Sequence, residues 1–157
     1  MQKLHCRWPS ITYYIRLIKI LLPGPSVGSI RTAYGTYDLI PVQLTWGNAR
    51  DFCKMSGGHL AAFETEAEFT VTNFPLLPTI SGSGSLATLY WIGMNDIATH
   101  GSYVWAHNNQ PVGNYRPWAP NEPYGNNEHC VLITDNVTGE WRDFPCDKKL
   151  YFICECP

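Results

Sequence analysis

The stretch EHCVLITDNVTGEWRDFPC, residues 128–146, decides how this chain folds. It begins with Glu128, and Asp143 precedes its second cysteine. A third carboxylate, Glu122, lies upstream in the segment WAPNEP, residues 118–123. Carboxylate oxygens gathered in this way are the ligands that a hard cation such as calcium requires. The three residues are therefore candidate cation ligands in a region bounded by cysteines.

The composition indicates one globular domain without a strong charge bias. The chain has 157 residues, of which 45% are hydrophobic, and it contains 6 Trp and 9 Tyr. This length and this share of apolar residues are sufficient for a buried core. The formal net charge of -2 gives no support to a nucleic-acid partner or to an anionic membrane surface.

The cysteines narrow the class of protein without assigning bonds, because six of them allow fifteen full pairings. No two form a CxxC motif, which argues against a zinc ribbon or a thioredoxin-type site. Composition leaves two classes open: a disulfide-bonded protein of an oxidising compartment, and a cytosolic protein with reduced thiols. The cysteines are Cys6, Cys53, Cys130, Cys146, Cys154 and Cys156.

The N-terminal segment differs from the rest of the chain. Its apolar run, ITYYIRLIKILL at 11–22, is interrupted by Arg16 and Lys19. The run is too short and too charged to span a bilayer, and it makes a poor core for a secretory signal. We expect residues 1–29 to be a degraded signal or another segment outside the domain, with a basic amphipathic helix as the alternative. Residues 30–157 are then expected to form the domain.

Two helices are predicted in the first half of the domain. Thr45 can cap a helix that Gly57 ends, because glycine readily adopts the left-handed conformation found there. A second helix begins at Thr65, three residues before Glu68 in capping-box spacing. We expect Pro75 to stop this helix.

Short strands and turns fill the remainder. Residues 31–44 have the pattern of an extended segment with an edge or bulge at Pro41. Residues 75–88 include a Gly/Ser run typical of a flexible loop. Short strands, two helices and no internal repeat predict an α+β fold with antiparallel sheet. The candidate strands are 89–93, 102–106, 130–134, 140–144 and 150–154.

Five motifs follow one another along the chain: GGHLA at 57–61, WIGMND at 91–96, GSYVW at 101–105, WAPNEP at 118–123 and WRD at 141–143. In this order they resemble the motifs of the C-type lectin domain family, from about Tyr34 to Cys154. The resemblance implies a C-type lectin-like fold, in which two helices, antiparallel sheets and a long irregular loop region are stapled by disulfides. The tryptophans of these motifs are expected in the core, because their large apolar bodies favour burial. They are Trp91, Trp105 and Trp118.

The resemblance also implies two disulfide bonds. One joins the first helix to the last strand and the other closes the loop region. The implied bonds are Cys53–Cys154 and Cys130–Cys146. Cys6 and Cys156 have no implied partner, so they can pair with each other or either can be free.

Sugar-binding members of this family hold calcium through carboxylates and amides, and the sugar adds two vicinal hydroxyls as further ligands. The positions of this chain that match the family's calcium ligands are Glu122, Glu128 and Asp143. Pro123 matches the family's cis proline. A Glu-Pro pair at this place implies mannose-type rather than galactose-type recognition.

Two positions depart from the family's pattern. Tyr124 stands where Asn or Asp is expected, and Arg142 stands where Asn is expected. A neutral phenol is a poor calcium ligand, and arginine supplies donors only. Its guanidinium can pair with the carboxylates or swing away from them. The resemblance thus implies a weak or absent calcium site, around millimolar, and a carbohydrate-binding set of Glu122, Tyr124, Glu128, Arg142 and Asp143.

Three functions are compared with the retained carboxylates and the two departures from the family pattern. The resemblance implies a secreted, extracellular lectin that binds a carbohydrate or glycoprotein ligand, with innate immune recognition as one role consistent with it. The alternative is a calcium-independent domain of the same fold that binds a protein or another non-sugar ligand. An enzyme that uses Glu122 and Glu128 as an acid–base pair is disfavoured, because the sequence has no HExxH motif, phosphate loop or nucleophile elbow.

Two further features concern the surface. Asn136-Val137-Thr138 is a glycosylation sequon in a segment rich in turn residues, so Asn136 is expected to carry a glycan if the chain is secreted. No collagen-like or heptad repeat is present to indicate an oligomer.

Overall fold

The computed structural model describes residues 29–76, 88–135 and 139–157. The expected signal segment, Cys6 and Asn136 therefore lie outside the described residues. Within the described ranges, none of the helices is of the length and apolarity that a membrane crossing needs.

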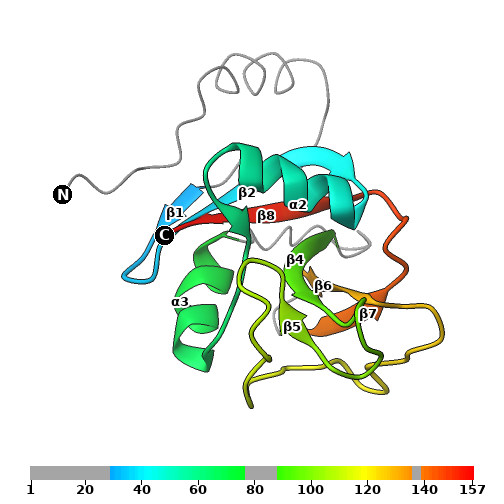
Figure 1. Ribbon diagram of the computed structural model, residues 1–157. Helices are drawn as coiled ribbons and strands as arrows, with labels where there is room; N and C mark the ends of the chain where they lie inside the picture. Colours follow the sequence, from blue (N-terminus) through cyan, green and yellow to red (C-terminus); the bar gives the residue numbers. More distant parts are fainter. Residues whose placement is uncertain (1–28, 77–87, 136–138) are drawn as a thin grey trace, which may run out of the picture.

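The described chain forms two helices and eight short strands (Figure 1). The helices are α2, Trp46–Met55, and α3, Glu66–Leu76. The strands are β1, Ser29–Arg31; β2, Thr36–Leu44; β3, His59–Leu60; β4, Leu89–Asn95; β5, Val104–Trp105; β6, Cys130–Thr134; β7, Trp141–Phe144; and β8, Leu150–Cys156.

The strands pair in the order β1-β2-β8-β4-β6-β7, with β3 on β8 and β5 on β4. All pairs are antiparallel except β4 and β8, which run parallel through Tyr90↔Tyr151 and Trp91↔Phe152. The sheet is therefore mixed, with one parallel pair beside the antiparallel pairs that the sequence predicts. The parallel pair arises because the last strand of the chain inserts between β2 and β4. Hydrophobic patterning marks a strand but not the direction of its neighbour.

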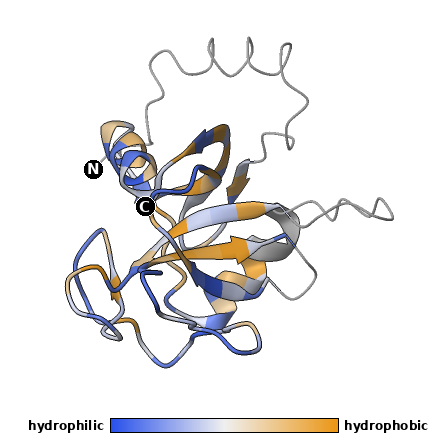
Figure 2. Cartoon of the chain, turned by 90° about the vertical axis from the view of Figure 1, so that its right-hand side faces the viewer, coloured by the Kyte–Doolittle hydropathy of each residue, from blue (hydrophilic) through white to orange (hydrophobic). Residues whose placement is uncertain are grey.

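Both faces of the sheet are buried, and alternate residues of one strand enter different cores. In β4, Ile92 and Met94 join one apolar cluster, whereas Trp91 joins the other. The second cluster contains α2 residues such as Ala49, and the first contains Phe69 of α3. Figure 2 shows the apolar residues running along the strands between more polar loops. Burial on both faces explains why β4 is almost continuously apolar.

The helix ends follow the predicted chemistry with one exception. The Thr45 side chain accepts a hydrogen bond from the Asn48 amide, and Gly57 follows α2 with φ 85°. The Glu68 amide donates to the Thr65 hydroxyl at 3.2 Å, as a capping box requires. The prediction that Pro75 stops the second helix was wrong, because α3 continues to Leu76.

The extended segment before α2 has the irregularity expected at its proline. β2 pairs with β8 up to Ile40↔Phe152, and the register then shifts before Leu44↔Leu150. Pro41 lies inside this interval and has no amide hydrogen to donate to a ladder. Strand β3 was not predicted, since two residues are too few to show a periodic pattern.

Two disulfides tie the sheet to the elements around it. The structure contains Cys53–Cys154 and Cys130–Cys146, the two bonds that the family resemblance implies. The first joins α2 to β8 across 101 residues and contributes about 4–5 kcal/mol in the chain-entropy model. Cys156 is also disulfide-bonded.

The long irregular region between β5 and β6 is held on the sheet by Trp141 of β7. The Trp141 amide donates to the Pro117 carbonyl at 2.9 Å, and its own carbonyl accepts from the Ala119 amide at 2.9 Å. Its buried indole lies against Trp105 and Trp118 in edge-to-face contacts. Trp118 is only partly buried, so it borders the core rather than filling it. These contacts bring the segment that follows Ala119 to the end of β7.

A buried acidic group lies in β8, between β2 and β4 in the strand order. The Glu155 carboxylate accepts a hydrogen bond from the Ala62 amide at 2.9 Å. Burial, with smaller contributions from the charges of Glu68 and Glu64, raises the pKa of Glu155 from 4.5 to about 8. The folded protein therefore holds a proton on Glu155 across a pH range in which the unfolded chain has lost it.

This shift predicts a pH-dependent stability. The stabilisation that comes from protonated Glu155 is complete below pH 4.5. It is lost progressively as the pH rises from 4.5 to about 8, the pKa in the fold. As the pH rises through this interval, the free energy of unfolding of the native protein should decrease. In Glu155→Gln the decrease should be smaller by roughly 1–3 kcal/mol. Urea titrations at several pH values measure this difference.

The exposed Glu66 supplies the control, since Glu66→Gln should leave the pH slope as in the native chain. Equal pH slopes in the native protein and the Glu155→Gln variant would contradict the assignment.

Candidate functional site

The three carboxylates predicted to form a cation site converge in the structure. One oxygen each from Glu122, Glu128 and Asp143 lies within 4.8 Å of the other two. Asp143 is buried on β7, while Glu122 and Glu128 lie on the loop before β6 and are partly exposed. Because the Trp141 pairing described above carries the loop to β7, residues about twenty apart in sequence meet at one point.

Asp143 is fixed by hydrogen bonds from the loop and from a buried tyrosine. Its Oδ1 accepts the Tyr124 amide at 2.8 Å, and its Oδ2 accepts the Gly125 amide at 2.9 Å. Oδ2 also accepts the Tyr103 hydroxyl at 3.3 Å. A carboxylate oxygen has two acceptor positions, so Oδ1 keeps one lone pair for a cation. Asp143 therefore anchors the loop and can also act as a ligand.

The loop adopts its shape because its residues tolerate left-handed backbone conformations. Positive φ angles occur at Asn121 (67°), Gly125 (76°), Asn126 (46°) and Asn127 (73°). Asparagine and glycine are the residues that reach this region at least cost. The Glu122–Pro123 peptide bond is cis, as the family resemblance implies.

The convergence of the carboxylates changes their acidity. Burial raises the pKa of Glu122 to about 7, and the neighbouring Asp143 adds to the effect. Burial and Asp143 also raise the pKa of Glu128. Like charges at this separation disfavour ionisation of the group, and a divalent cation would remove that repulsion. The site therefore has the electrostatics of a cation site.

The two residues that depart from the family pattern are placed differently from the carboxylates. The Tyr124 residue is 66% exposed, and its contact with Asp143 comes from its backbone amide. The Arg142 guanidinium forms an ion pair with Glu140 at 3.8 Å. Consecutive strand residues point to opposite faces, so Asp143 faces the loop while Arg142 is directed outward. Of the two orientations weighed for Arg142, the structure shows the one that swings away. Its charge still lowers the pKa of Glu122.

A second cluster of possible ligands was missed by the sequence analysis. Asp96, His100 and His129 bring one ligand atom each within 4.8 Å of the others. The spacing of Asp96 and His100 was the available signal, but His129 lies 33 residues from Asp96. His59, by contrast, stacks on His107 with ring centroids 4.3 Å apart.

Comparison with known proteins shows a consistent family. Residues 42–156 match the family model for the lectin C-type domain. The chain is 35% identical over 125 residues to C-type lectin domain family 4 member K of Homo sapiens, which covers 77% of this chain and 35% of that protein. It is 34% identical over 119 residues to collectin-10 of Gallus gallus, covering 76% of this chain and 40% of that protein. With lithostathine-2 of Mus musculus, 128 residues are 32% identical and cover 78% and 70% of the two chains.

Three solved structures share the fold. Human lithostathine superposes with a TM-score of 0.68 at 27% identity, covering 83% of this chain and 97% of that chain. A calcium-independent type II antifreeze protein gives 0.65 at 27% identity, with coverages of 83% and 92%. The cow carbohydrate-recognition domain of CD23, solved in the presence of a GlcNAc2Man3 oligosaccharide, gives 0.64 at 25% identity, with coverages of 83% and 93%.

The loop geometry gives a prediction for Gly125. An added Cβ would lie 3.2 Å from the His100 ring, and φ at this position is 76°. Gly125→Ala should therefore strain the loop and weaken the hydrogen bond from the residue 125 amide to Asp143. It should destabilise the fold by about 1–2 kcal/mol. Thermal unfolding and the amide shift of residue 125 measure these effects.

Gly113→Ala is the matched control, because nothing lies within 4 Å of an added Cβ there. An unchanged melting temperature and an unchanged amide shift in Gly125→Ala would show that the loop does not depend on this glycine.

Proposed function

The chain belongs to the C-type lectin domain family, and we propose that it is a secreted carbohydrate-binding lectin with a weak calcium site. The observation that carries the proposal is the convergence of Glu122, Glu128 and Asp143 within 4.8 Å. Because the chain spans only 35% and 40% of two of its relatives, the activity of those whole proteins is not transferred to it. Members of the family are generally binding proteins rather than enzymes, which supports a binding role.

Calcium fits the three carboxylates better than a smaller cation would. It takes six to eight oxygens in flexible geometry, and three side chains leave room for water and for two sugar hydroxyls. Three carboxylates and Arg142 give a local charge of about -2 when all are ionised, which a divalent ion balances. Burial first and the neighbouring Asp143 second raise the pKa of Glu122 to about 7, and a bound divalent cation would favour its ionised form.

The affinity for calcium is proposed to be low, around millimolar as in extracellular modules. The Asp143 oxygens already accept hydrogen bonds from the Tyr124 and Gly125 amides, so a cation competes with donors inside the protein. Tyr124 and Arg142 supply neither the carboxylate nor the amide oxygens used by other family members. Sugar affinity through the ion would be correspondingly low.

The sugar would lie between the carboxylates and an exposed aromatic ring. Tyr124 is 66% exposed beside the site, and aromatic rings offer an apolar face with a polar tip. The Glu122-Pro123 pair supports a mannose-type ligand, as does the likeness to the CD23 domain solved with a mannose-containing oligosaccharide. In this proposal Arg142 contributes from the rim.

An extracellular setting is proposed on the strength of the disulfides, which persist in oxidising compartments. The proposal includes a domain of residues 30–157, a glycan on Asn136 and a degraded signal in the N-terminal segment. Innate immune recognition is the role proposed for a lectin of this kind.

A second candidate function is supported by one specific observation. Asp143 accepts hydrogen bonds from Tyr103, Tyr124 and Gly125, so donors within the protein already attach the loop to this carboxylate. A calcium-independent type II antifreeze protein shares the fold at 27% identity. The alternative is a calcium-independent domain whose exposed Tyr124 contacts a protein or another non-sugar ligand.

Calcium titration of the oxidised protein by calorimetry tests the site. The native chain should bind one calcium around millimolar. Arg142→Asn should tighten binding roughly three- to tenfold, because it removes a positive charge near Glu122. Arg50→Asn removes the same charge on α2 and should change nothing at the site. Micromolar affinity in the native protein, or no gain in Arg142→Asn, would overturn the weak-site account.

Retention on immobilised sugars separates the two functions. A lectin of the proposed kind should be retarded on mannose resin more than on galactose resin in millimolar calcium, and a chelator should abolish the retardation. Glu128→Gln should lose retention while Glu66→Gln keeps it, because Glu128 belongs to the converging set and Glu66 is exposed on α3. Failure to bind either resin with calcium present would favour the calcium-independent alternative.

A further inference from the structure

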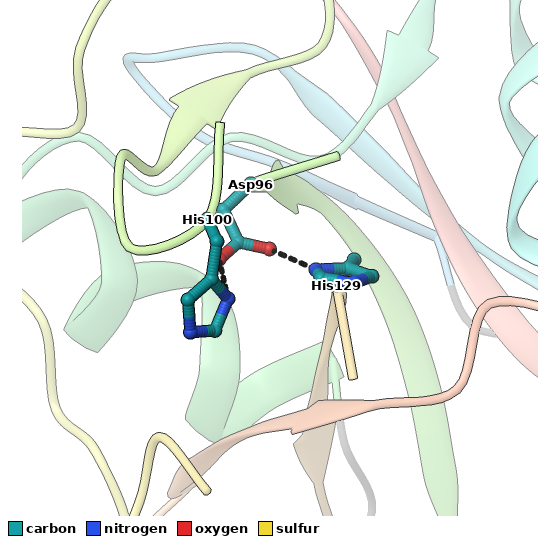
Figure 3. Close-up of side chains that lie close together, drawn as sticks. All are labelled: Asp96, His100 and His129. Atoms are coloured by element: carbon teal, nitrogen blue, oxygen red, sulfur yellow. Dashed lines mark hydrogen bonds and ion pairs between the residues drawn. The ribbon is translucent and has the colours of Figure 1, made fainter. Parts of the chain in front are cut away.

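A second group of ligand atoms lies beside the carboxylate site, built from three side chains. The Asp96 carboxylate is fully buried, and its two oxygens face the rings of His100 and His129 (Figure 3). The distance from Oδ1 to His129 Nδ1 is 2.9 Å, and that from Oδ2 to His100 Nδ1 is 3.4 Å. The two imidazole rings lie 5.8 Å apart in an edge-to-face arrangement.

These separations suit a tetrahedral metal. With metal–ligand distances of about 2.0–2.1 Å, two ligands of a tetrahedral zinc lie about 3.3 Å apart. The two Asp96–histidine distances fall on either side of this value. An ion placed between the carboxylate and the rings would thus need only small side-chain rotations.

The backbone fixes the three residues relative to one another. The Asp96 amide donates to the His129 carbonyl at 3.0 Å, which ties the end of β4 to the residue before β6. The Gly101 amide donates to Asp96 Oδ2 at 2.7 Å and orients the carboxylate. The turn that carries His100 closes through the Thr99 amide and the Asp96 carbonyl at 3.2 Å. Second contacts of this kind hold metal ligands in place.

The donor set selects a different ion from that of the carboxylate site. Two imidazole nitrogens and one carboxylate oxygen suit zinc and similar transition metals, whereas calcium prefers oxygen ligands alone. We propose that Asp96, His100 and His129 bind a divalent transition metal of the zinc class. The His100 side chain is 67% exposed and that of His129 is 35% exposed, which leaves the remaining coordination positions to water or an external donor.

The competing interpretation is a set of hydrogen bonds from two surface histidines to a buried carboxylate. Two observations favour the metal site. The Asp96 carboxylate is fully buried and accepts a hydrogen bond from the Gly101 amide. Its orientation is therefore fixed by the backbone and does not depend on either histidine. Both rings also present the same atom, Nδ1, to opposite oxygens of one carboxylate, which is the convergence a metal requires.

Zinc titration of the full oxidised chain tests the proposal, in buffer that contains millimolar calcium to occupy the carboxylate site. The native protein should bind one zinc ion, and His100→Gln and His129→Gln should each weaken binding about tenfold or more. His107→Gln is the matched control, because its ring stacks on His59 away from the cluster. Visible absorption of bound cobalt provides a second readout of tetrahedral nitrogen and oxygen coordination.

Absence of zinc binding in the native protein would overturn the proposal. So would binding that survives both His100→Gln and His129→Gln, or binding lost equally in His107→Gln. These readouts require neither sugar nor binding at the carboxylate site, so they stand apart from the test of the lectin function.

Discussion

The carboxylate of Asp143 attaches the part of the long loop that carries the candidate site to the sheet, beyond the pairing of the loop with Trp141. Its two oxygens accept the amides of Tyr124 and Gly125, and the buried Tyr103 hydroxyl supports it from below. These bonds fix the left-handed stretch around Gly125 against β7. The places of Glu122 and Glu128 therefore depend on this one side chain.

The same carboxylate has two roles that oppose each other. As an anchor, the Asp143 carboxylate accepts hydrogen bonds from two backbone amides. As a ligand, it must offer a lone pair to a cation. Burial and mutual repulsion raise the pKa of Glu122 and Glu128, which favours an incoming cation. The competition between amide donors and a cation for the same oxygens is the physical reason for the low calcium affinity that we propose.

Much of the fold follows from local chemistry that the sequence displays. Thr45 and Thr65 mark the helix starts through their hydroxyls, and strand β6 coincides with its predicted range because it is a clean apolar run. The convergence of the three carboxylates and the two disulfides came from family resemblance rather than from periodicity. The parallel pairing of β4 with β8 is a long-range arrangement that no local pattern encodes.

Two features of the candidate sites were not predicted from the sequence, because both depend on long-range pairing. The outward direction of Arg142 depends on the register of a short strand, where one residue of shift exchanges the two faces. The meeting of Asp96 and His129 depends on the backbone bond between β4 and the start of β6. Local motifs thus identified ligand types, while tertiary pairing decided which of them meet.

A crystal structure of the oxidised protein grown in calcium tests the central claim most directly. The account predicts an ion about 2.3–2.6 Å from oxygens of Glu122, Glu128 and Asp143, with the Tyr124 and Gly125 amides still close to Asp143. Carboxylates that keep only their amide partners, with no ion among them at saturating calcium, would contradict it.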